Sequence, residues 1–272
     1  MGCLTNYWES LALNHVMLGS ACPQPTDLFL ALFTSDPAGA GEGAISFSGE
    51  PDGASYERQQ IGVGSANWTT STNKSSTNQN LIDFGVAGED WSTITHYAVM
   101  DDLTLQSEAN MLFHGEFSSS KTVTSGTSVR VQAGELSLTA GSAIISNYMG
   151  NGLINHLLNI SAFSQSSSIQ VGLSTTNPGA DGGNITDPTG TPGTTLVTHT
   201  DWTTSSAGTA VANSSTITFT AAASNWGLVG HGYILNQSSN LLFYGNLASG
   251  GVTVSSGESV RFSASQLSLN FG

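Results

Sequence analysis

The chain has 272 residues, and its 19 acidic against 5 basic side chains give a formal net charge of −14. Five cations cannot neutralise a nucleic-acid backbone or hold the chain on an anionic lipid surface, so we expect neither nucleic acid nor membrane as a partner. Hydrophobic residues make up 38% of the chain, enough to bury a core, which argues against a disordered protein.

The first predicted element is a helix over residues 5–18. Its apolar and aromatic positions recur at helical spacing: Leu4, Trp8, Leu11, His15 and Leu18. Asn6, with Glu9 three residues later, fits a capping box at the helix start. A helix this short is marginal alone in water, so we expect it to pack against its own domain or a neighbouring subunit.

After the helix the sequence period changes to two, which is typical of strands. The predicted strands are residues 28–33, 56–63, 80–86, 94–100, 111–117, 128–132 and 135–139. Asp36-Pro37 and the glycines that follow predict the first turn. Short strands separated by turn residues are typical of an antiparallel β-sandwich or jelly-roll-like domain.

The second half of the chain repeats the first. Asn6–Gly41 aligns with Asn147–Gly182 without a gap, with 11 identities in 36 positions. Near the ends of the repeats, Gly126–Gly141 and Gly257–Gly272 share 9 of 16 residues, including Ser-Val-Arg and Leu-Ser-Leu. An internal repeat of this length indicates two copies of one structural unit.

The repeat predicts two domains, residues 1–141 and 142–272. Each is close to the commonest domain size and can bury its own core. The expected fold is therefore mainly β, with two tandem antiparallel β-sandwich (jelly-roll-like) domains, each with one short helix at its N-terminal end. Residues 145–158 are the predicted helix of the second domain.

One strand predicts an apolar patch. In the second repeat, Ile169–Ser174 alternates apolar with small or polar residues, so the apolar set faces the core. By alignment Leu28, Leu30 and Leu32 face the core of the first repeat, which leaves Phe29 and Phe33 on the opposite face. Because a soluble protein seldom exposes such a patch, we expect both rings to be covered. The N-terminal segment, the second repeat, loops of the first repeat and another subunit are all open as the cover.

Four further residues are candidates for contacts with other subunits. Tyr7 and Trp8 lie on the predicted helix. Arg130 and Arg261 occupy equivalent positions on a predicted strand and are two of only five cations. Each arginine is either a solvent-facing charge that protects a strand edge or the partner of an acidic group on a neighbouring subunit.

No catalytic or metal-binding pattern stands out. His15 and His156, like His96 and His231, recur in both repeats, and we interpret them as core or interface residues. The spacings HExxH, CxxC and GxSxG are absent, and no acidic residue of the second repeat aligns with one in the first. We therefore predict no enzyme activity, no metal and no cofactor.

The two cysteines, Cys3 and Cys22, both lie in the first repeat. The first residues carry no positive charge ahead of an apolar run, so we expect no secretory signal peptide. In a chain made in the cytosol, two free thiols are expected rather than a disulfide.

The succession of motifs in the first repeat resembles a known family. These motifs are Leu-Phe-Thr-Ser-Asp-Pro at 32–37, Tyr-Glu-Arg-Gln at 56–59, Trp-Ser-Thr-Ile-Thr-His at 91–96, Asn-Met-Leu-Phe-His-Gly at 110–115 and Gly-Glu-Leu-Ser-Leu at 134–138. Their order resembles the small tail-fibre or minor structural proteins of tailed bacteriophages. The resemblance is weaker in the second repeat, which lacks the Tyr-x-Arg-Gln motif.

The resemblance implies a non-enzymatic virion protein, assembled in the host cytoplasm, that binds other virion proteins and copies of itself. A tail or neck appendage or a fibre-associated subunit fits, and a capsid decoration (cement) protein is an open alternative. An alternative of another class is a carbohydrate-binding module that contacts a host-surface glycan. That function needs exposed aromatic rings, for which the candidates are Trp68, Trp202, Trp91 and Trp226.

Overall fold

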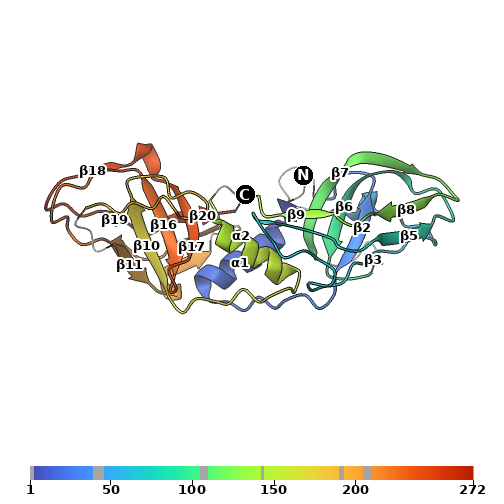
Figure 1. The fold of residues 1–272 in the computed structure, drawn as a ribbon, viewed down its shortest axis with the longest axis horizontal. Coiled ribbons are helices and arrows are strands. Elements are labelled where there is room, and N and C mark those ends of the chain that lie inside the picture. Colours follow the sequence, from blue (N-terminus) through green and yellow to red (C-terminus); the bar gives the residue numbers. More distant parts are fainter. Residues whose placement is uncertain are drawn as a thin grey trace. The chain divides into compact units, whose positions relative to one another are not determined.

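The computed structural model describes residues 3–38, 46–104, 110–141, 144–189, 193–204 and 210–271. Their secondary structure is mainly antiparallel β, with one α-helix in the N-terminal part of each sequence repeat (Figure 1). The predicted fold class is confirmed. In the part of the chain that the structure describes, no helix is long and apolar enough to cross a membrane.

The chain forms two compact units. Unit 1 comprises Met1–Glu9, Pro23–Gly141 and Asn151–Phe163, and unit 2 comprises Ser10–Cys22, Ser142–Gly150 and Ser164–Gly272. Each unit therefore includes a short segment that the sequence assigns to the other repeat. The domain boundary after residue 141 stays a prediction from the repeat.

Unit 1 is built on a five-stranded antiparallel sheet, in which β2, β6 and β7 lie side by side (Figure 1). Its strand order is β1 (Cys3–Leu4), β7 (Met111–Val123), β6 (Ser92–Met100), β2 (Phe29–Phe33) and β3 (Gln59–Gln60). Two further antiparallel pairs are β4 (Ser75–Thr77) with β9 (Ser137–Thr139) and β5 (Ile82–Val86) with β8 (Ser128–Val131).

Unit 2 contains corresponding elements, among which β16 and β17 are shorter than β6 and β7. Its main sheet has the order β11 (Thr194–Val197), β10 (Ile169–Ser174), β16 (His231–Asn236) and β17 (Leu241–Asn246). The remaining sheets are β12 (Trp202–Thr204), β13 (Ala210–Asn213) and β20 (Ser268–Asn270), then β14 (Ile217–Thr218) with β19 (Arg261–Phe262), and β15 (Gly227–Val229) with β18 (Val252–Val254).

Two predicted strands differ from the structure by six residues in length, and the others differ by one or two residues. Only Gln59–Gln60 of the predicted strand 56–63 pairs with β2, because the backbone turns at Gly62, where φ is +64°. A positive φ costs glycine nothing and disfavours other residues. Strand β7 runs six residues further than predicted, to Val123, because its polar end continues the ladder with β6. The mainly polar Ser118–Thr122 lacks the apolar alternation that marks a strand in the sequence.

Helix α1 (Asn6–Leu18) begins one residue after its cap, Thr5. The Thr5 hydroxyl accepts the backbone N–H of Trp8 at 3.4 Å and donates to the carbonyl of Met111 at 2.6 Å. The cap is therefore Thr5, and the prediction that Asn6 caps the helix is wrong, since Asn6 is already helical. The hydroxyl joins the helix start to the first residue of β7.

Ser146 does the same in unit 2, ahead of helix α2 (Asn147–Leu157). Its hydroxyl accepts the N–H of Met149 at 3.0 Å and donates to the carbonyl of Leu241, the first residue of β17. Thr5 and Ser146 are 141 positions apart, the spacing of the repeat, so both helices start from the same joint with the sheet.

The C-terminal half of α2 belongs to unit 1. The side-chain oxygen of Asn155 accepts the N–H of Ser71 at 2.8 Å, and that of Asn151 accepts the N–H of Lys74 at 2.7 Å. The turn before β4 is therefore fixed by side chains that the second repeat contributes. This arrangement satisfies the expectation that a short helix needs a packed neighbour.

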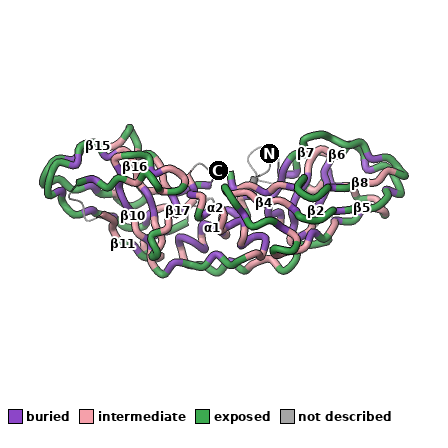
Figure 2. The backbone as a smooth tube through the Cα atoms, viewed as in Figure 1, coloured by how far each residue is buried: buried purple, intermediate pink, exposed green. Residues whose placement is uncertain are grey.

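Strand β2 is covered on both faces, and Figure 2 shows buried segments, in purple, among the strands of unit 1. Ala31 and Phe33 form one core cluster with Ala38, Ala98, Met100 and Met111, against which Phe29 and Phe47 pack. Phe33 is fully buried, Phe29 is half-buried, and Phe47 lies in the segment after the first turn. The cover of Phe33 thus includes a loop of its own repeat.

The corresponding face of β10 is also covered. Gly172 is paired with Tyr233, and a Cβ on Gly172 would lie 2.1 Å from the Tyr233 ring. The pair is Ala31 with Ala98 at the corresponding place in unit 1. In unit 2 the Tyr233 ring covers Gly172 and fills the space that two alanines fill in unit 1. This exchange of side-chain volume keeps both cores densely packed. The face that looks polar in the sequence is therefore buried.

A buried asparagine fixes the end of each unit. The Asn78 side chain donates to the carbonyls of Asn80 and Gln132 at 2.8 and 2.9 Å, and it accepts the N–H of Leu136 at 2.9 Å. Its own carbonyl accepts the N–H of Gly134 at 2.8 Å. Asn78 therefore holds the turn between β8 and β9.

Asn213 makes the same set of bonds in unit 2. It donates to the carbonyls of Ser215 and Ser263 at 2.7 and 2.8 Å and accepts the N–H of Leu267 at 2.8 Å. The turn it holds joins β19 to β20. Both asparagines are buried, so their side-chain hydrogen bonds form away from water.

We expect Asn78→Ala and Asn213→Ala each to lower the free energy of unfolding by about 1–3 kcal/mol, because the first leaves the buried N–H of Leu136 and the second the half-buried N–H of Leu267 without an acceptor. Chemical denaturation measures the loss. The matched control is Asn80→Ala, an exposed asparagine two residues away, which we expect to change stability by about 0.5 kcal/mol or less. Equal effects at the buried and exposed positions would contradict the role assigned to Asn78.

Candidate functional site: two equivalent grooves

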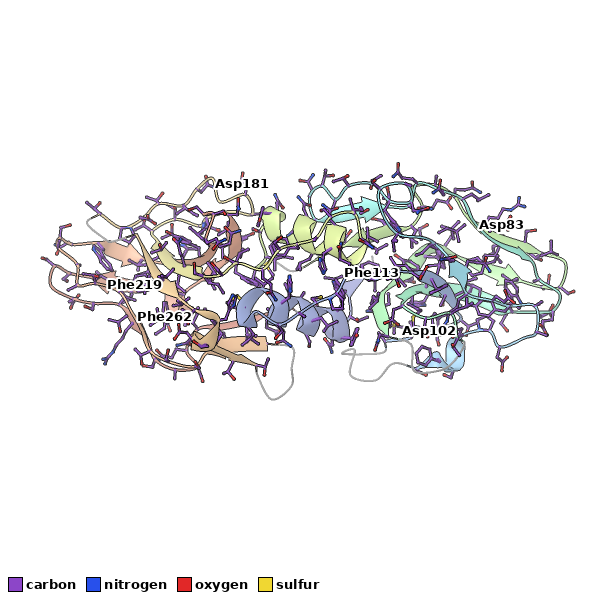
Figure 3. The ribbon with its side chains drawn as sticks, turned by 90° about the horizontal axis from the view of Figure 1, so that it is seen from below. Asp83, Asp102, Phe113, Asp181, Phe219 and Phe262 are labelled. Carbon is purple, nitrogen blue, oxygen red and sulfur yellow. The ribbon has the colours of Figure 1, made fainter. Side chains whose placement is uncertain are left out.

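Arg130 lies on β8 at the surface of unit 1. Its Nε is 2.9 Å from Oδ2 of Asp83 on β5, and both side chains are well exposed, at 54% and 37%. The N–H of Gly85 and then Arg130 hold the pKa of Asp83 below its usual range. Figure 3 shows Asp83 far from Phe113, which lies in the core of the same unit. Arg130 is thus a surface cation, paired within its own unit.

A groove of about 500 Å³ opens in unit 1 beside this pair. Its walls come from consecutive strands: Glu116–Lys121 of β7 on one side and Val129–Val131 of β8 on the other. The aromatic ring of Tyr97 packs on Phe117 in the same lining, with ring centroids 5.0 Å apart. The Lys121 ammonium donates to the carbonyl of Ser128 at 2.5 Å. The groove therefore combines aromatic, hydroxyl and charged groups.

Unit 2 has a groove of about 950 Å³ at the corresponding place. Its walls are Asn246–Ala248 with Val252–Val254 on one side and Glu258–Phe262 on the other. Phe262 meets Phe219 edge-to-face, with ring centroids 6.3 Å apart (Figure 3). Thus the segment that carries the repeated arginine lines the groove in both units.

The grooves are equivalent in sequence as well as in place. The most similar block of the repeat, Gly126–Gly141 with Gly257–Gly272, supplies one wall of each. Lining residues that match between the blocks are Val129 with Val260, Arg130 with Arg261 and Ser137 with Ser268. The arginines that the sequence singles out thus occupy the same position in two similar grooves.

Open strand edges border both grooves. Among the described residues, β8 pairs only with β5, and β19 pairs only with β14. Residues of β8 line the unit 1 groove, and residues of β19 line the unit 2 groove. An unpaired edge offers backbone donors and acceptors to an incoming extended segment.

The four aromatic candidates differ in access. Trp8 is buried and stacks on His156 with ring centroids 6.1 Å apart, so it packs within unit 1. Phe33 is buried too, as described above. Tyr7 is 39% exposed and Phe29 is half-buried. A contact with another chain stays a prediction for these two residues and for the two arginines.

His15 and His156 make structural hydrogen bonds. Nδ1 of His15 lies 3.0 Å from the carbonyl of Ser20, and Nδ1 of His156 accepts the N–H of Phe163 at 3.1 Å. Among the residues that the structure describes, no cluster of three or more His, Cys, Asp or Glu side chains could hold a metal ion. Cys22 is buried, and burial raises the pKa of its thiol to about 11; the side chain of Cys3 lies outside the described residues.

Unit 1 also contains a buried ion pair that the sequence does not predict. Nε and Nη2 of Arg58 lie 2.7 and 2.8 Å from the two carboxylate oxygens of Glu50, and neither side chain is exposed. Nη1 donates to the carbonyl of Asp102 at 2.9 Å. The Tyr56 hydroxyl donates to Glu50 at 3.4 Å, and burial, followed by the charge of Glu50, raises its pKa.

This cluster ties a loop to the main sheet of unit 1. The Tyr56 hydroxyl also accepts the N–H of Leu32 in the middle of β2, so the cluster holds the 50–58 segment to the main sheet. Tyr56 and Arg58 belong to the Tyr-Glu-Arg-Gln motif, and that motif is absent from the second repeat. The motif could have suggested a buried arginine, but nothing in the sequence pairs it with Glu50.

We expect Glu50→Gln to lower the free energy of unfolding by about 3–5 kcal/mol, because it leaves the Arg58 charge buried without its counter-ion. Thermal or chemical denaturation measures this loss. Asp83→Asn is the matched control, since it neutralises the acid of the exposed pair, and we expect it to leave the melting temperature nearly unchanged. A large loss in the control, or none in Glu50→Gln, contradicts the assignment.

A protein-family model matches the chain. The model of the family described as podophage GP4 fiber I protein gp80 matches residues 3–139 and 144–270, which is nearly the whole chain in two segments. No curated protein matches the chain. The two segments each carry one helix, one main sheet and one groove. A family model that covers this much of the sequence and agrees with a mainly β fold shows that the chain belongs to the podophage fiber protein family of gp80.

Proposed function

We propose that this chain is a non-enzymatic structural subunit of a podophage virion, built into the tail fibre or into its attachment to the tail or neck. The observation that carries the proposal is the match to a fiber protein family over both segments of the chain. Such a subunit is synthesised in the host cytoplasm and works in the assembled particle. It binds other virion proteins and copies of itself.

The geometry supports a binding rather than a catalytic role. The surface feature that recurs in both units is a groove bordered by open strand edges, and such edges bind extended polypeptide. The buried charged groups Glu50 and Arg58 form an ion pair with each other in the core of unit 1. We propose the repeats 1–141 and 142–272 as the two domains, each bringing one groove to the particle.

The carbohydrate-binding alternative has less support. It needs exposed aromatic rings, and the four tryptophans considered for it are buried: Trp68, Trp91, Trp202 and Trp226. No described feature favours a capsid decoration protein over a fibre subunit. The fibre proposal therefore stands on the family, and partner contacts through Tyr7 and Phe29 remain part of it.

Mass spectrometry of purified virions, with a cryo-EM map, tests the proposal. We expect the chain at a fixed stoichiometry and density for its two units on the tail. Virions that lack the chain, or that carry it across the capsid lattice, contradict a tail-fibre role. The second result is the one that a decoration protein gives.

A further inference from the structure

The cores of the two units differ at one pair of equivalent positions, Tyr97 on β6 and Gly232 on β16. Each directly follows the histidine that both repeats carry at the same place in this strand. The strand register confirms the match, because each residue pairs with a leucine on one neighbouring strand and a glycine on the other: Tyr97 with Leu32 and Gly115, and Gly232 with Leu173 and Gly245. Unit 2 therefore has a glycine where unit 1 has a tyrosine.

In unit 1 the Tyr97 side chain is buried and held on several sides. Its ring packs against Phe113 and Phe117, with ring centroids 6.4 and 5.0 Å away. Its hydroxyl donates to the carbonyl of Ser137 on β9 at 3.3 Å. One phenol ring thus fills the space between the main sheet and β9, and its polar end has a hydrogen-bond acceptor.

Unit 2 has a pocket of about 190 Å³ at this place, lined by both Gly232 and Gly245. A Cβ on Gly232 would make only ordinary contacts, the nearest 3.5 Å from Leu247, and a Cβ on Gly245 would meet nothing within 4 Å. The pocket is therefore the space that a side chain at position 232 would enter. Its lining also includes the counterparts of the residues that hold Tyr97: Phe243 for Phe113, Leu247 for Phe117 and Ser268 for Ser137.

The size and lining of the pocket suit one aromatic ring. A cavity of about 150 Å³ lined by aliphatic and aromatic side chains is large enough to bind benzene. Val171, Ile234 and Phe262 add apolar groups to the lining, and Phe262 stands where unit 1 has the smaller Val131. Asn246 in the lining is exposed, so the pocket opens to solvent. A mostly apolar pocket with a few polar groups is typical of small-ligand sites.

We propose that this pocket of unit 2 is a binding site for a single phenol ring, held as the Tyr97 ring is held in unit 1. Phe243 and Leu247 pack against the ring, and the carbonyl of Ser268 accepts its hydroxyl. The ring belongs to a small phenol or to a tyrosine side chain of another protein, since both present the same group. The site is additional to the fibre role proposed above, and neither depends on the other.

An NMR titration of the full chain with p-cresol tests the site. We expect saturable binding with a Kd on the order of 1 mM, and toluene, which lacks the hydroxyl, should bind at least about threefold more weakly. Gly232→Tyr places the chain's own ring in the pocket and should raise the Kd for p-cresol at least about tenfold. Leu196→Tyr is the matched control, because it adds a tyrosine at an exposed position of the same sheet outside the pocket, and it should change Kd by less than about twofold.

A circular dichroism melt confirms that each variant is folded, and Gly232→Val, a smaller filling variant that should raise the Kd at least about threefold, replaces Gly232→Tyr if the latter does not fold. N-acetyl-tyrosinamide distinguishes the two sources of the ring: it binds about as tightly as p-cresol if the pocket takes a tyrosine side chain, and at least about tenfold more weakly if it takes small phenols alone.

The proposal is overturned if p-cresol shows no saturable binding, if the folded filling variants bind it as tightly as the wild type, or if toluene binds equally well. A chain that is present in virions but fails this test loses only the phenol site. A chain absent from virions loses the proposed function, whatever it binds.

Discussion

The groove of each unit depends on one buried asparagine. Asn78 and Asn213 each bind a turn through a carbonyl acceptor and a backbone N–H, and those turns lead from the arginine-bearing strand to the last strand of the unit. Any other conformation of the turn would leave the side-chain amide of the buried asparagine without partners, which costs free energy, so the turn has one low-energy conformation. The groove wall that carries the arginine therefore has a fixed conformation in the absence of a partner. This lowers the conformational entropy that is lost on binding.

The starts of the two helices are also fixed by hydrogen bonds from one side chain each. Thr5 and Ser146 each cap a helix and bond to the first residue of a sheet strand with a single hydroxyl. Residues 151–163 belong to unit 1 and residues 10–22 to unit 2, so neither repeat forms its unit from its own residues alone.

Much of this architecture follows from the sequence, because the repeat and the period-two strands determine which residues are buried. The arginines were identified because they align, and their place in a groove follows from the strand edges, which the sequence does not show. The asparagines were missed although the 135-residue offset between Trp91 and Trp226 also relates Asn78 to Asn213. The Glu50–Arg58 pair and the cover of Gly172 by Tyr233 could not be predicted, since both depend on three-dimensional packing between distant segments.

Hydrogen exchange measured by mass spectrometry, on the isolated chain and on purified virions, tests the central claim that the strand edges at the grooves bind other polypeptide in the particle. The account predicts that peptides covering Ser128–Val131 and Arg261–Phe262 gain protection together in the virion, because their free edges become hydrogen-bonded. The turns bound by Asn78 and Asn213 should already be protected in the isolated chain. Protection gained only outside these two strands, with their free edges exchanging as fast as before, would contradict the account.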